Sequence, residues 1–286
     1  ARSFSSGLKA NPLIGLAFSP DEKLLASVSA LGTAQLWDTS GTLVTELRGH
    51  TDEVIDVSFS PVDEIIATAS RDGTAKLWNF KGDLLVDLEG HIDAVQEAAF
   101  SHDGKLVATA SEDDTVKVWN QDGQVIYSFE DAVGPVYSVA FSSDSLTLAA
   151  SGADNTARVW DLTRPENPIA VLQGHSAPIW SITFSPDGQR LATASDDNSV
   201  KLWSSDGRLI TTLNGHTQEA NSVAFNHDGT ALVSGGSDER VLVWEIQDLS
   251  LEQLMAEGCN WVNDYLVQRR STALGAQELP TAFCPL

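Results

Sequence analysis

Tryptophan recurs along this chain at a nearly constant interval, and this recurrence limits the possible folds more than any other feature. The intervals are 41, 41, 41, 43 and 41 residues, between Trp37, Trp78, Trp119, Trp160, Trp203 and Trp244. A period of this length makes each repeat one small unit that cannot bury its apolar face alone and must stack on its neighbours. The sequence therefore predicts six stacked units.

A Gly-His pair recurs in step with the tryptophans. Four units carry it, at Gly49-His50, Gly90-His91, Gly174-His175 and Gly215-His216. The histidine follows the preceding tryptophan by thirteen residues, except in the fourth connection, which is longer by two. The corresponding slot between the third and fourth tryptophans reads Asp131-Ala132 instead.

The segments between these markers have the pattern of short β-strands. An alternating run such as "VIDVSF" follows the histidine, and a small-residue run such as "RLATAS" comes next. Turn residues such as Pro186-Asp187-Gly188 separate the runs. Period-two alternation broken by turns indicates antiparallel strands. We expect an all-β domain of six four-stranded units over residues 1–246, followed by a helical and then irregular tail over 247–286.

Period, Gly-His pair and strand pattern together resemble the WD repeat, and residues 8–246 resemble a WD40 β-propeller. The terminal Trp-Asp pair itself is kept at Trp37-Asp38 and Trp160-Asp161. The six tryptophan units predict a ring of six blades, rather than the seven that are commonest in the resembled family. Each unit begins with its innermost strand, so the sixth blade needs an outer strand from elsewhere. Residues 1–6 and 249–254 are the two candidates.

The resemblance also implies a reason for pairing tryptophan with histidine. The indole N–H donates to a hydroxyl on the second strand, the hydroxyl donates to the imidazole, and the imidazole donates to an Asp in the following turn. Complete sets are expected in three blades: His50, Ser70, Asp72 and Trp78; His91, Ser111, Asp113 and Trp119; His175, Ser195, Asp197 and Trp203. The other blades are expected to be incomplete, with Gly236 at the hydroxyl position of the sixth, Ala132 and Gly152 in the fourth, and only Ser29 and Trp37 kept in the first.

Ser, His and Asp within hydrogen-bonding reach also resemble a hydrolase triad. A catalytic triad occurs once, whereas this set recurs in several blades with a tryptophan attached, so we interpret it as structural. The innermost strands end in small or apolar runs such as "SFS" and "ITF". We predict a non-enzymatic interaction scaffold that needs no cofactor or metal. The alternative is an enzyme or metal-binding protein that uses the central channel.

Charge limits the partners of such a scaffold. Forty acidic residues against 17 basic ones give a net charge of −23, which repels nucleic acid and anionic membranes. The two cysteines, Cys259 and Cys284, form no disulfide framework, and we expect a cytoplasmic protein. The expected partner is a protein or peptide. Self-association through an incompletely closed sixth blade is the other possibility.

In the resembled family, partners usually bind the narrower face of the disc. Contact residues there lie three and five positions after the His slot, and one position before the turn Asp. Carried over, the first set is Pro12 and Ile14, Glu53 and Ile55, Ala94 and Gln96, Pro135 and Tyr137, Pro178 and Trp180, Glu219 and Asn221; the second is Ala30, Arg71, Glu112, Ala153, Asp196 and Ser237. We expect Trp180, Tyr137, the two prolines, Ile14 and Ile55 to form an apolar patch with Arg71 as a cationic anchor. The alternative is that Trp180 fills the core.

The tail carries a second resemblance. The segment "EGCNWVNDYL" at residues 257–266 resembles the tail of large bacterial proteins that end in a WD array. In those proteins a nucleotide-binding signalling module often precedes the array. The resemblance implies that this chain is the sensor end of a larger NTPase. The missing initiator Met fits a piece of a longer protein.

Overall fold

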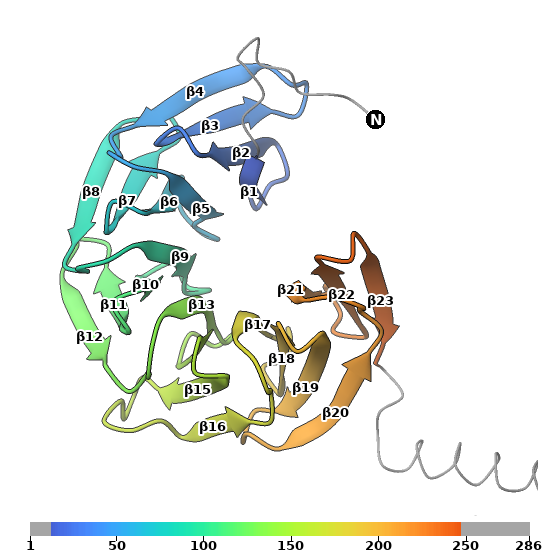
Figure 1. Ribbon diagram of the computed structural model, residues 1–286. Coiled ribbons are helices and arrows are strands. Elements are labelled where there is room, and N and C mark those ends of the chain that lie inside the picture. Colours follow the sequence, from blue (N-terminus) through green and yellow to red (C-terminus); the bar gives the residue numbers. More distant parts are fainter. Residues whose placement is uncertain (1–12, 247–286) are drawn as a thin grey trace, which may run out of the picture.

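The computed structural model describes residues 13–246, and every regular element in this range is a β-strand. The 23 strands form five four-stranded sheets and one three-stranded sheet, arranged as blades around a common centre (Figure 1). The predicted all-β architecture of six blades is confirmed. No helix in this range is long and apolar enough to cross a membrane.

Each blade takes its strands from consecutive segments of the chain. Blade 1 is β1 (Leu13–Phe18), β2 (Leu24–Ser29), β3 (Thr33–Asp38) and β4 (Leu43–Arg48), and blade 2 is β5 (Val54–Phe59), β6 (Ile65–Ser70), β7 (Thr74–Asn79) and β8 (Leu84–Glu89). Blade 3 is β9 (Val95–Phe100), β10 (Leu106–Ser111), β11 (Val116–Asn120) and β12 (Val125–Phe129), and blade 4 is β13 (Val136–Phe141), β14 (Thr147–Gly152), β15 (Thr156–Asp161) and β16 (Ala170–Gln173). Blade 5 is β17 (Ile179–Phe184), β18 (Arg190–Ser195), β19 (Ser199–Ser204) and β20 (Leu209–Asn214), and blade 6 is β21 (Ala220–Phe225), β22 (Ala231–Gly236) and β23 (Val241–Glu245).

Within a blade, each strand pairs antiparallel with the next one in sequence. The first strand of each blade lies nearest the centre, and the fourth lies at the rim (Figure 1). This order places the loop before each first strand and the turn after each second strand at the same end of the blade. We call the surface formed by these loops and turns the His face, because it carries the Gly-His pairs.

The apolar core consists of five clusters, one between each pair of consecutive blades. Between blades 1 and 2, Ala26, Val28 and Leu36 of blade 1 pack against Val57 and Trp78 of blade 2. Each blade therefore has two different sides. Its aliphatic face, rich in Ala, Val and Leu, packs on the next blade, and its tryptophan face packs on the preceding one.

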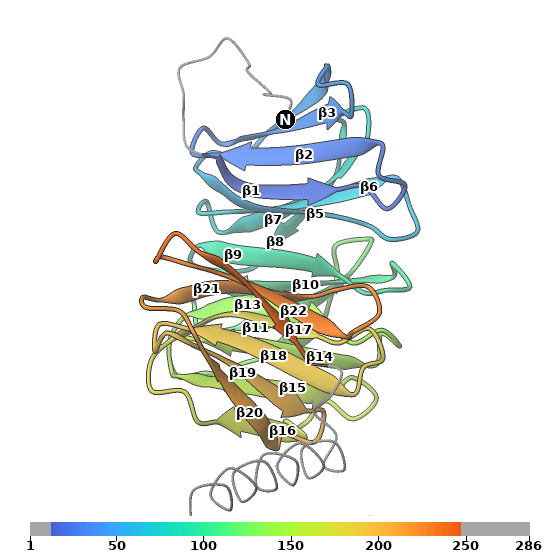
Figure 2. The same cartoon turned by 90° about the vertical axis from the view of Figure 1, so that its right-hand side faces the viewer.

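The ring predicted from the sequence is open among the described residues. Blades 1 and 6 stand apart (Figure 1), and in Figure 2 the opening faces the viewer, with β1 and β2 above and β21 and β22 below. Packing of each tryptophan face on an aliphatic face sets the rotation from blade to blade. Five such rotations do not bring blade 6 back to blade 1.

Several predictions concern residues outside 13–246. These are the tail at 247–286 and both segments proposed to complete the sixth blade, 1–6 and 249–254. In the described range that blade has three strands, and β23 is its last. The boundary of the propeller domain at 246 and the origin of a fourth strand stay predictions.

Candidate interaction face

Four blades contain a complete hydrogen-bonded set that joins tryptophan to histidine. In blade 3, Trp119 Nε1 donates to Thr109 Oγ1 over 2.9 Å, and the same hydroxyl lies 2.7 Å from His91 Nε2. His91 Nδ1 lies 2.9 Å from a carboxylate oxygen of Asp113. Blades 2 and 5 repeat this geometry through His50, Asp72 and Trp78 and through His175, Asp197 and Trp203. The predicted His, Asp and Trp members of all three sets are confirmed.

The predicted hydroxyl members are wrong by two residues. Thr68, Thr109 and Thr193 bind the indole and the imidazole in place of Ser70, Ser111 and Ser195. The serines instead connect two loops of the His face. Ser111 Oγ donates to the carbonyl of Asp93 and accepts the N–H of Asp113, and Ser70 and Ser195 have the same role. Both positions lie on the same side of the second strand, but only the earlier one lies beneath the indole.

In the first and sixth blades, too, the hydroxyl comes from the residue two positions before the predicted one. In blade 6, Ser234 takes the hydroxyl position and binds both Trp244 and His216, so this set is complete despite Gly236. Asp238 completes it at 3.0 Å from the imidazole. In blade 1, Trp37 donates to Ser27 over 2.9 Å rather than to Ser29.

The charges in these sets follow from burial and hydrogen bonding. Burial lowers the pKa of His91 more than Asp113 raises it, so the imidazole is neutral at neutral pH. Burial raises the pKa of Asp72, but hydrogen bonds from Thr74, the Thr51 N–H and His50 outweigh it and hold the pKa at about 2. A neutral imidazole beside a carboxylate must donate a hydrogen bond through Nδ1. Its Nε2 therefore accepts a hydrogen bond from the threonine hydroxyl. Each set is a satisfied network that rigidifies its blade.

The glycine before each histidine is required by the same tryptophan. A Cβ on Gly215 would lie 2.7 Å from the Trp244 ring, and a Cβ on Gly90 would lie 3.2 Å from the Trp119 ring. Gly90 also has a φ of 154°, which L residues with side chains rarely adopt. The Gly-His pair is thus the place where a loop passes closely over an indole.

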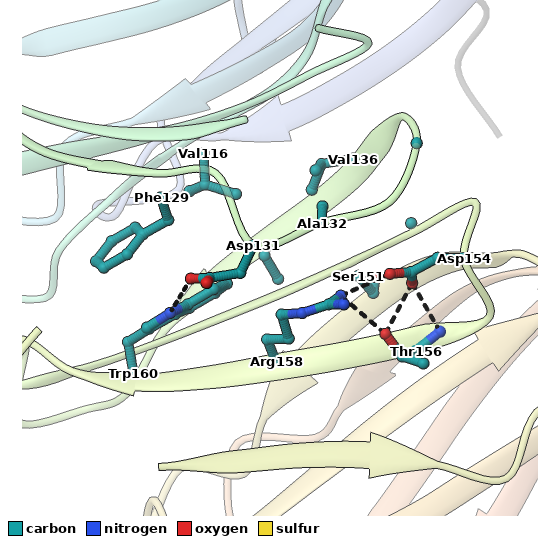
Figure 3. Close-up of a pocket in the computed structure, with 13 residues that line it drawn as sticks. Val116, Phe129, Asp131, Ala132, Val136, Ser151, Asp154, Thr156, Arg158 and Trp160 are labelled. Atoms are coloured by element: carbon teal, nitrogen blue, oxygen red, sulfur yellow. Dashed lines mark hydrogen bonds and ion pairs between the residues drawn. The ribbon is translucent and has the colours of Figure 1, made fainter. Parts of the chain in front are cut away.

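Blade 4 lacks this hydrogen-bonded set, and the indole N–H of its tryptophan has a different partner. Ala150 stands at the hydroxyl position and Ala132 at the histidine position, so Trp160 Nε1 reaches Asp131 at 3.4 Å. Arg158 fills part of the space and binds Asp154 over 2.7 Å (Figure 3). A cavity of about 10 Å³ remains among these side chains. This volume is close to the minimum for a single water molecule.

Grafting the missing set should stabilise blade 4. The triple variant Asp131→Gly, Ala132→His, Ala150→Thr restores the glycine, imidazole and hydroxyl around Trp160 and Asp154. We expect the free energy of unfolding to rise by about 1–3 kcal/mol, because three buried hydrogen bonds replace one long one. Urea denaturation measures this. The variant with Ala132→His alone should gain nothing, because its imidazole lacks the bridging hydroxyl; an equal gain would refute the proposed set.

On the His face, two predicted contact residues from neighbouring blades form an aromatic pair. Tyr137 of β13 and Trp180 of β17 stack with ring centroids 4.2 Å apart and planes 15° from parallel. Trp180 remains 38% exposed, so the alternative that it fills the core is wrong. Its indole N–H donates to Asp196, which fixes the ring on the surface. The exposed Trp180 and the half-buried Tyr137 thus form an aromatic pair held in one orientation on this face.

The other predicted contact residues lie on this face in a more polar setting. Arg71 is exposed and forms an ion pair with Glu53 at 2.7 Å, so the expected cationic anchor is already partnered. Asn221 is exposed and donates to Ser237, and Gln96 donates to Glu112. Ile14, Ile55, Pro135 and Pro178 are exposed or half-buried, whereas the predicted contact residue Ala94 is buried. Pro12 lies outside the described residues.

The family comparison agrees with the blade geometry. A family model described as WD domain, G-beta repeat matches residues 5–38, 41–79, 82–120, 123–161, 166–204 and 207–245. Each match ends one residue after the tryptophan of one blade. The chain belongs to this family. Among curated proteins, none matches the chain. WD repeats generally mediate protein–protein interactions and typically form non-enzymatic scaffolds.

Three exposed apolar residues on the His face were missed by the sequence reasoning. Ile92 is 93% exposed and Val133 is 76% exposed, and both directly follow the His slot of their WD repeat. Leu31 occupies the turn-Asp position of blade 1 and is also exposed. The signal was present in the sequence, because the other WD repeats have Thr51, Ser176 and Thr217 at the position of Ile92.

Side chains on the innermost strands connect one WD blade to the next, and this too was missed. Asp56 accepts the N–H of Ala98 in blade 3, and Glu97 accepts the N–H of Val139 in blade 4. Burial raises the pKa of Asp56 to about 6. Burial, together with the charge of Asp56, raises the pKa of Glu97 to about 8. Acidic residues at equivalent positions of two apolar strands were the available signal.

The residues of the channel bear on the alternative of an enzyme or metal-binding protein. Within residues 13–246, no three His, Cys, Asp or Glu side chains gather into a group that could hold a metal ion. Asp56 and Glu97 each already accept a backbone N–H from the next blade. Their positions are explained by linkage between blades.

Proposed function

We propose that the His face binds a protein or peptide and that a basic side chain of this partner docks on Tyr137 and Trp180. The stacking of the half-buried Tyr137 on the exposed Trp180 is the observation that supports the proposal. Aromatic residues held rigidly in an interface lose little conformational freedom on binding and often dominate its energy. Ile92 and Val133 offer further exposed apolar surface on the same face.

The charges around the pair favour a basic partner. Burial raises the pKa of the Tyr137 hydroxyl, and the negative charges of Glu112 and Asp196 raise it further. Both carboxylates are therefore close enough to act on a cation bound over the rings. A guanidinium or ammonium group over an aromatic face gains cation–π attraction as well as charge pairing. The net charge of −23 would also attract a basic segment at long range.

Binding of immobilised peptides that differ only in charge tests the proposal. We expect arginine-containing peptides to bind and their glutamate counterparts not to bind. Trp180→Ala should weaken the binding by about 30-fold, since central aromatic contacts typically contribute about 2 kcal/mol or more. The combined change Glu112→Gln and Asp196→Asn should reduce the salt dependence of the affinity.

Val62→Ala is the matched control, because Val62 is exposed in a turn at the opposite end of its blade. This variant should bind like the unaltered protein. Unchanged binding by Trp180→Ala, combined with loss in Val62→Ala, would place the site on the opposite face. Equal binding of basic and acidic peptides would refute the charge argument alone.

The proposal extends to the architecture of the whole protein. The likeness of residues 257–266 to the tails of multidomain bacterial proteins supports a role as the sensor end of a larger NTPase. Binding on the His face would then regulate a nucleotide-hydrolysing module in the same polypeptide. The sequence of the gene upstream of residue 1 tests this directly, and an upstream region without a nucleotide-binding motif would rule it out.

A further inference from the structure

The interface between blades 4 and 5 contains a groove on the face opposite the His face. This opposite face is formed by the turns that follow the first and the third strand of each blade. The groove has a volume of about 350 Å³, which is within the size range of binding pockets. Six residues line it: Thr147, Ile169, Phe184, Gly188, Ser205 and Asp206.

Ser205 stands at a position that larger side chains fill in the neighbouring blades. This position lies two residues after the blade's tryptophan. The backbone N–H groups of Leu162, Ser205 and Ile246 all donate to a carbonyl of the turn after the first strand, over 2.8 to 2.9 Å, so the three residues are equivalent in space. Leu162 and Ile246 are buried in the clusters that join blades 4 and 6 to their preceding blades. The serine side chain is too short to fill the same place between blades 4 and 5.

Blades 2 and 3 also fill this position, each in a different way. Phe80 packs edge-on against Phe59, with ring centroids 5.6 Å apart. Gln121 donates to the carbonyl of Gly104 and reaches back to the Asp63 carboxylate of blade 2. Among the described blades that pack on a preceding one, blade 5 is therefore the only one with a small residue here.

The walls of the groove are partly apolar. Phe184, the equivalent of Phe59, is buried at the interface between blades 4 and 5. Ile169 of blade 4 is 56% exposed and lines the groove from the rim. An apolar side chain placed in the groove would therefore contact both residues and lose its own contact with water.

Carboxylates stand at the mouth of the groove. The two turns of blade 5 that border it carry Asp187 and Asp206, and both residues are exposed. A hydrogen bond from a serine hydroxyl in each turn lowers the pKa of the carboxyl, so both are ionised at neutral pH. Arg208 pairs with Asp206 at 2.9 Å, but this ion pair is exposed and is readily exchanged for another. The mouth therefore favours a basic over an acidic partner.

We propose that this groove binds a leucine or isoleucine side chain of a partner protein, with a lysine or arginine beside it in the partner sequence. The aliphatic side chain would take the place that Leu162 and Ile246 occupy in the neighbouring interfaces. The basic side chain would pair with the carboxylates at the mouth. The groove is thus a second binding surface, separate from the aromatic pair on the His face.

A phage library of random dodecapeptides is the probe that tests the proposal. Selection on the Trp180→Ala variant removes peptides that need the aromatic pair of the His face. We expect the selected peptides to share a Leu or Ile next to a Lys or Arg. The affinity of each selected peptide is then measured for the unaltered protein and for variants of the groove.

Ser205→Leu should weaken the selected peptides by about 10-fold or more, because its side chain takes the place of the partner's aliphatic group. The variant should remain folded, since leucine occupies the equivalent position of blade 4. Its Tm should rise by about 2–4 °C, because the added side chain fills the groove. Ser205→Ala is the matched control and should bind like the unaltered protein.

A second pair of variants leaves the width of the groove unchanged at Ser205. Ile169→Ala should weaken the selected peptides by about 5-fold, because it removes part of the apolar wall. Ile210→Ala is its control. Ile210 is the equivalent residue of blade 5, is also exposed and lies outside the groove, so its replacement should leave the affinity unchanged.

Four results would overturn the proposal. Selected peptides could bind Ser205→Leu and Ile169→Ala as tightly as the unaltered protein, or could be rich in Asp and Glu. With no peptide selected, an apolar dye that binds the unaltered protein but not Ser205→Leu would assign the groove to a small apolar ligand. Self-association that light scattering detects in the unaltered protein but not in Ser205→Leu would assign it to a second copy of the chain.

Discussion

Replacing His91 by alanine should lower the free energy of unfolding by about 1–3 kcal/mol. The imidazole connects the Thr109 hydroxyl to the Asp113 carboxylate, at 2.7 and 2.9 Å. Its removal leaves the Thr109 hydroxyl without its acceptor and removes one donor from Asp113. His102→Ala is the control, since His102 lies exposed in a turn of the same blade and should be replaced at almost no cost. Urea denaturation at neutral pH measures the free energy of unfolding of both variants.

A second pair of variants separates the threonine from the serine two residues further on. Thr109→Val keeps the shape of the side chain but removes the oxygen on which Trp119 and His91 converge. Ser111→Ala removes only a link between two loops. We expect Thr109→Val to be as costly as His91→Ala and Ser111→Ala to cost less. The reverse order would mean that the indole is not held through Thr109.

The wrong choice of hydroxyl shows what a repeat pattern leaves unspecified. Each second strand ends in Thr-Ala-Ser or a similar run, and alternate residues of a strand point to the same side. Two hydroxyls therefore satisfied the pattern equally well. Blade 6 could have decided between them, because it keeps His216, Asp238 and Trp244 with Gly236 at the later position and Ser234 at the earlier one. A kept His, Asp and Trp imply a hydroxyl, and only Ser234 supplies it.

The blades were predictable, but the closure of the ring was not. Strands, turns and blade number follow from local periodicity, which is visible in every repeat. Closure depends on the rotation between neighbouring blades, and this rotation is set by packing across whole faces. The exposed Leu16 and Phe18 look in sequence like Val57 and Phe59, which lie in a closed interface. Only the arrangement in space distinguishes them.

The interaction face was predictable in part for a similar reason. Tyr137 and Trp180 occupy equivalent positions in adjacent repeats, so their proximity follows from the repeat, and the structure confirms it by their stacking. The pairing of Arg71 with Glu53 depends on side-chain conformations that the period does not specify. A carboxylate three positions after the His slot could equally have faced solvent.

The linkage of blades through Glu97 predicts an unusual dependence of stability on pH. Its folded-state pKa is raised to about 8 by burial and by the charge of Asp56, from an ordinary value of 4.5. Below pH 4.5 the carboxyl is protonated in both the folded and the unfolded state. As pH rises from 4.5 to 8, the unfolded state loses its proton and the folded state keeps it. This residue therefore makes folding less favourable with rising pH across that window.

Glu97→Gln should remove this dependence, because the amide is neutral at every pH and its carbonyl oxygen can still accept the Val139 N–H. Near pH 4 the variant and the unaltered protein should be about equally stable, and at pH 8 the variant should be more stable by about 4 kcal/mol. Only the difference between the two chains is interpreted, so the contributions of Asp72, Asp197 and the buried histidines cancel. Chemical denaturation from pH 4 to 8 measures it. A difference that stays constant with pH would show that Glu97 is ionised in the folded blade and that its link to Val139 is a charged hydrogen bond.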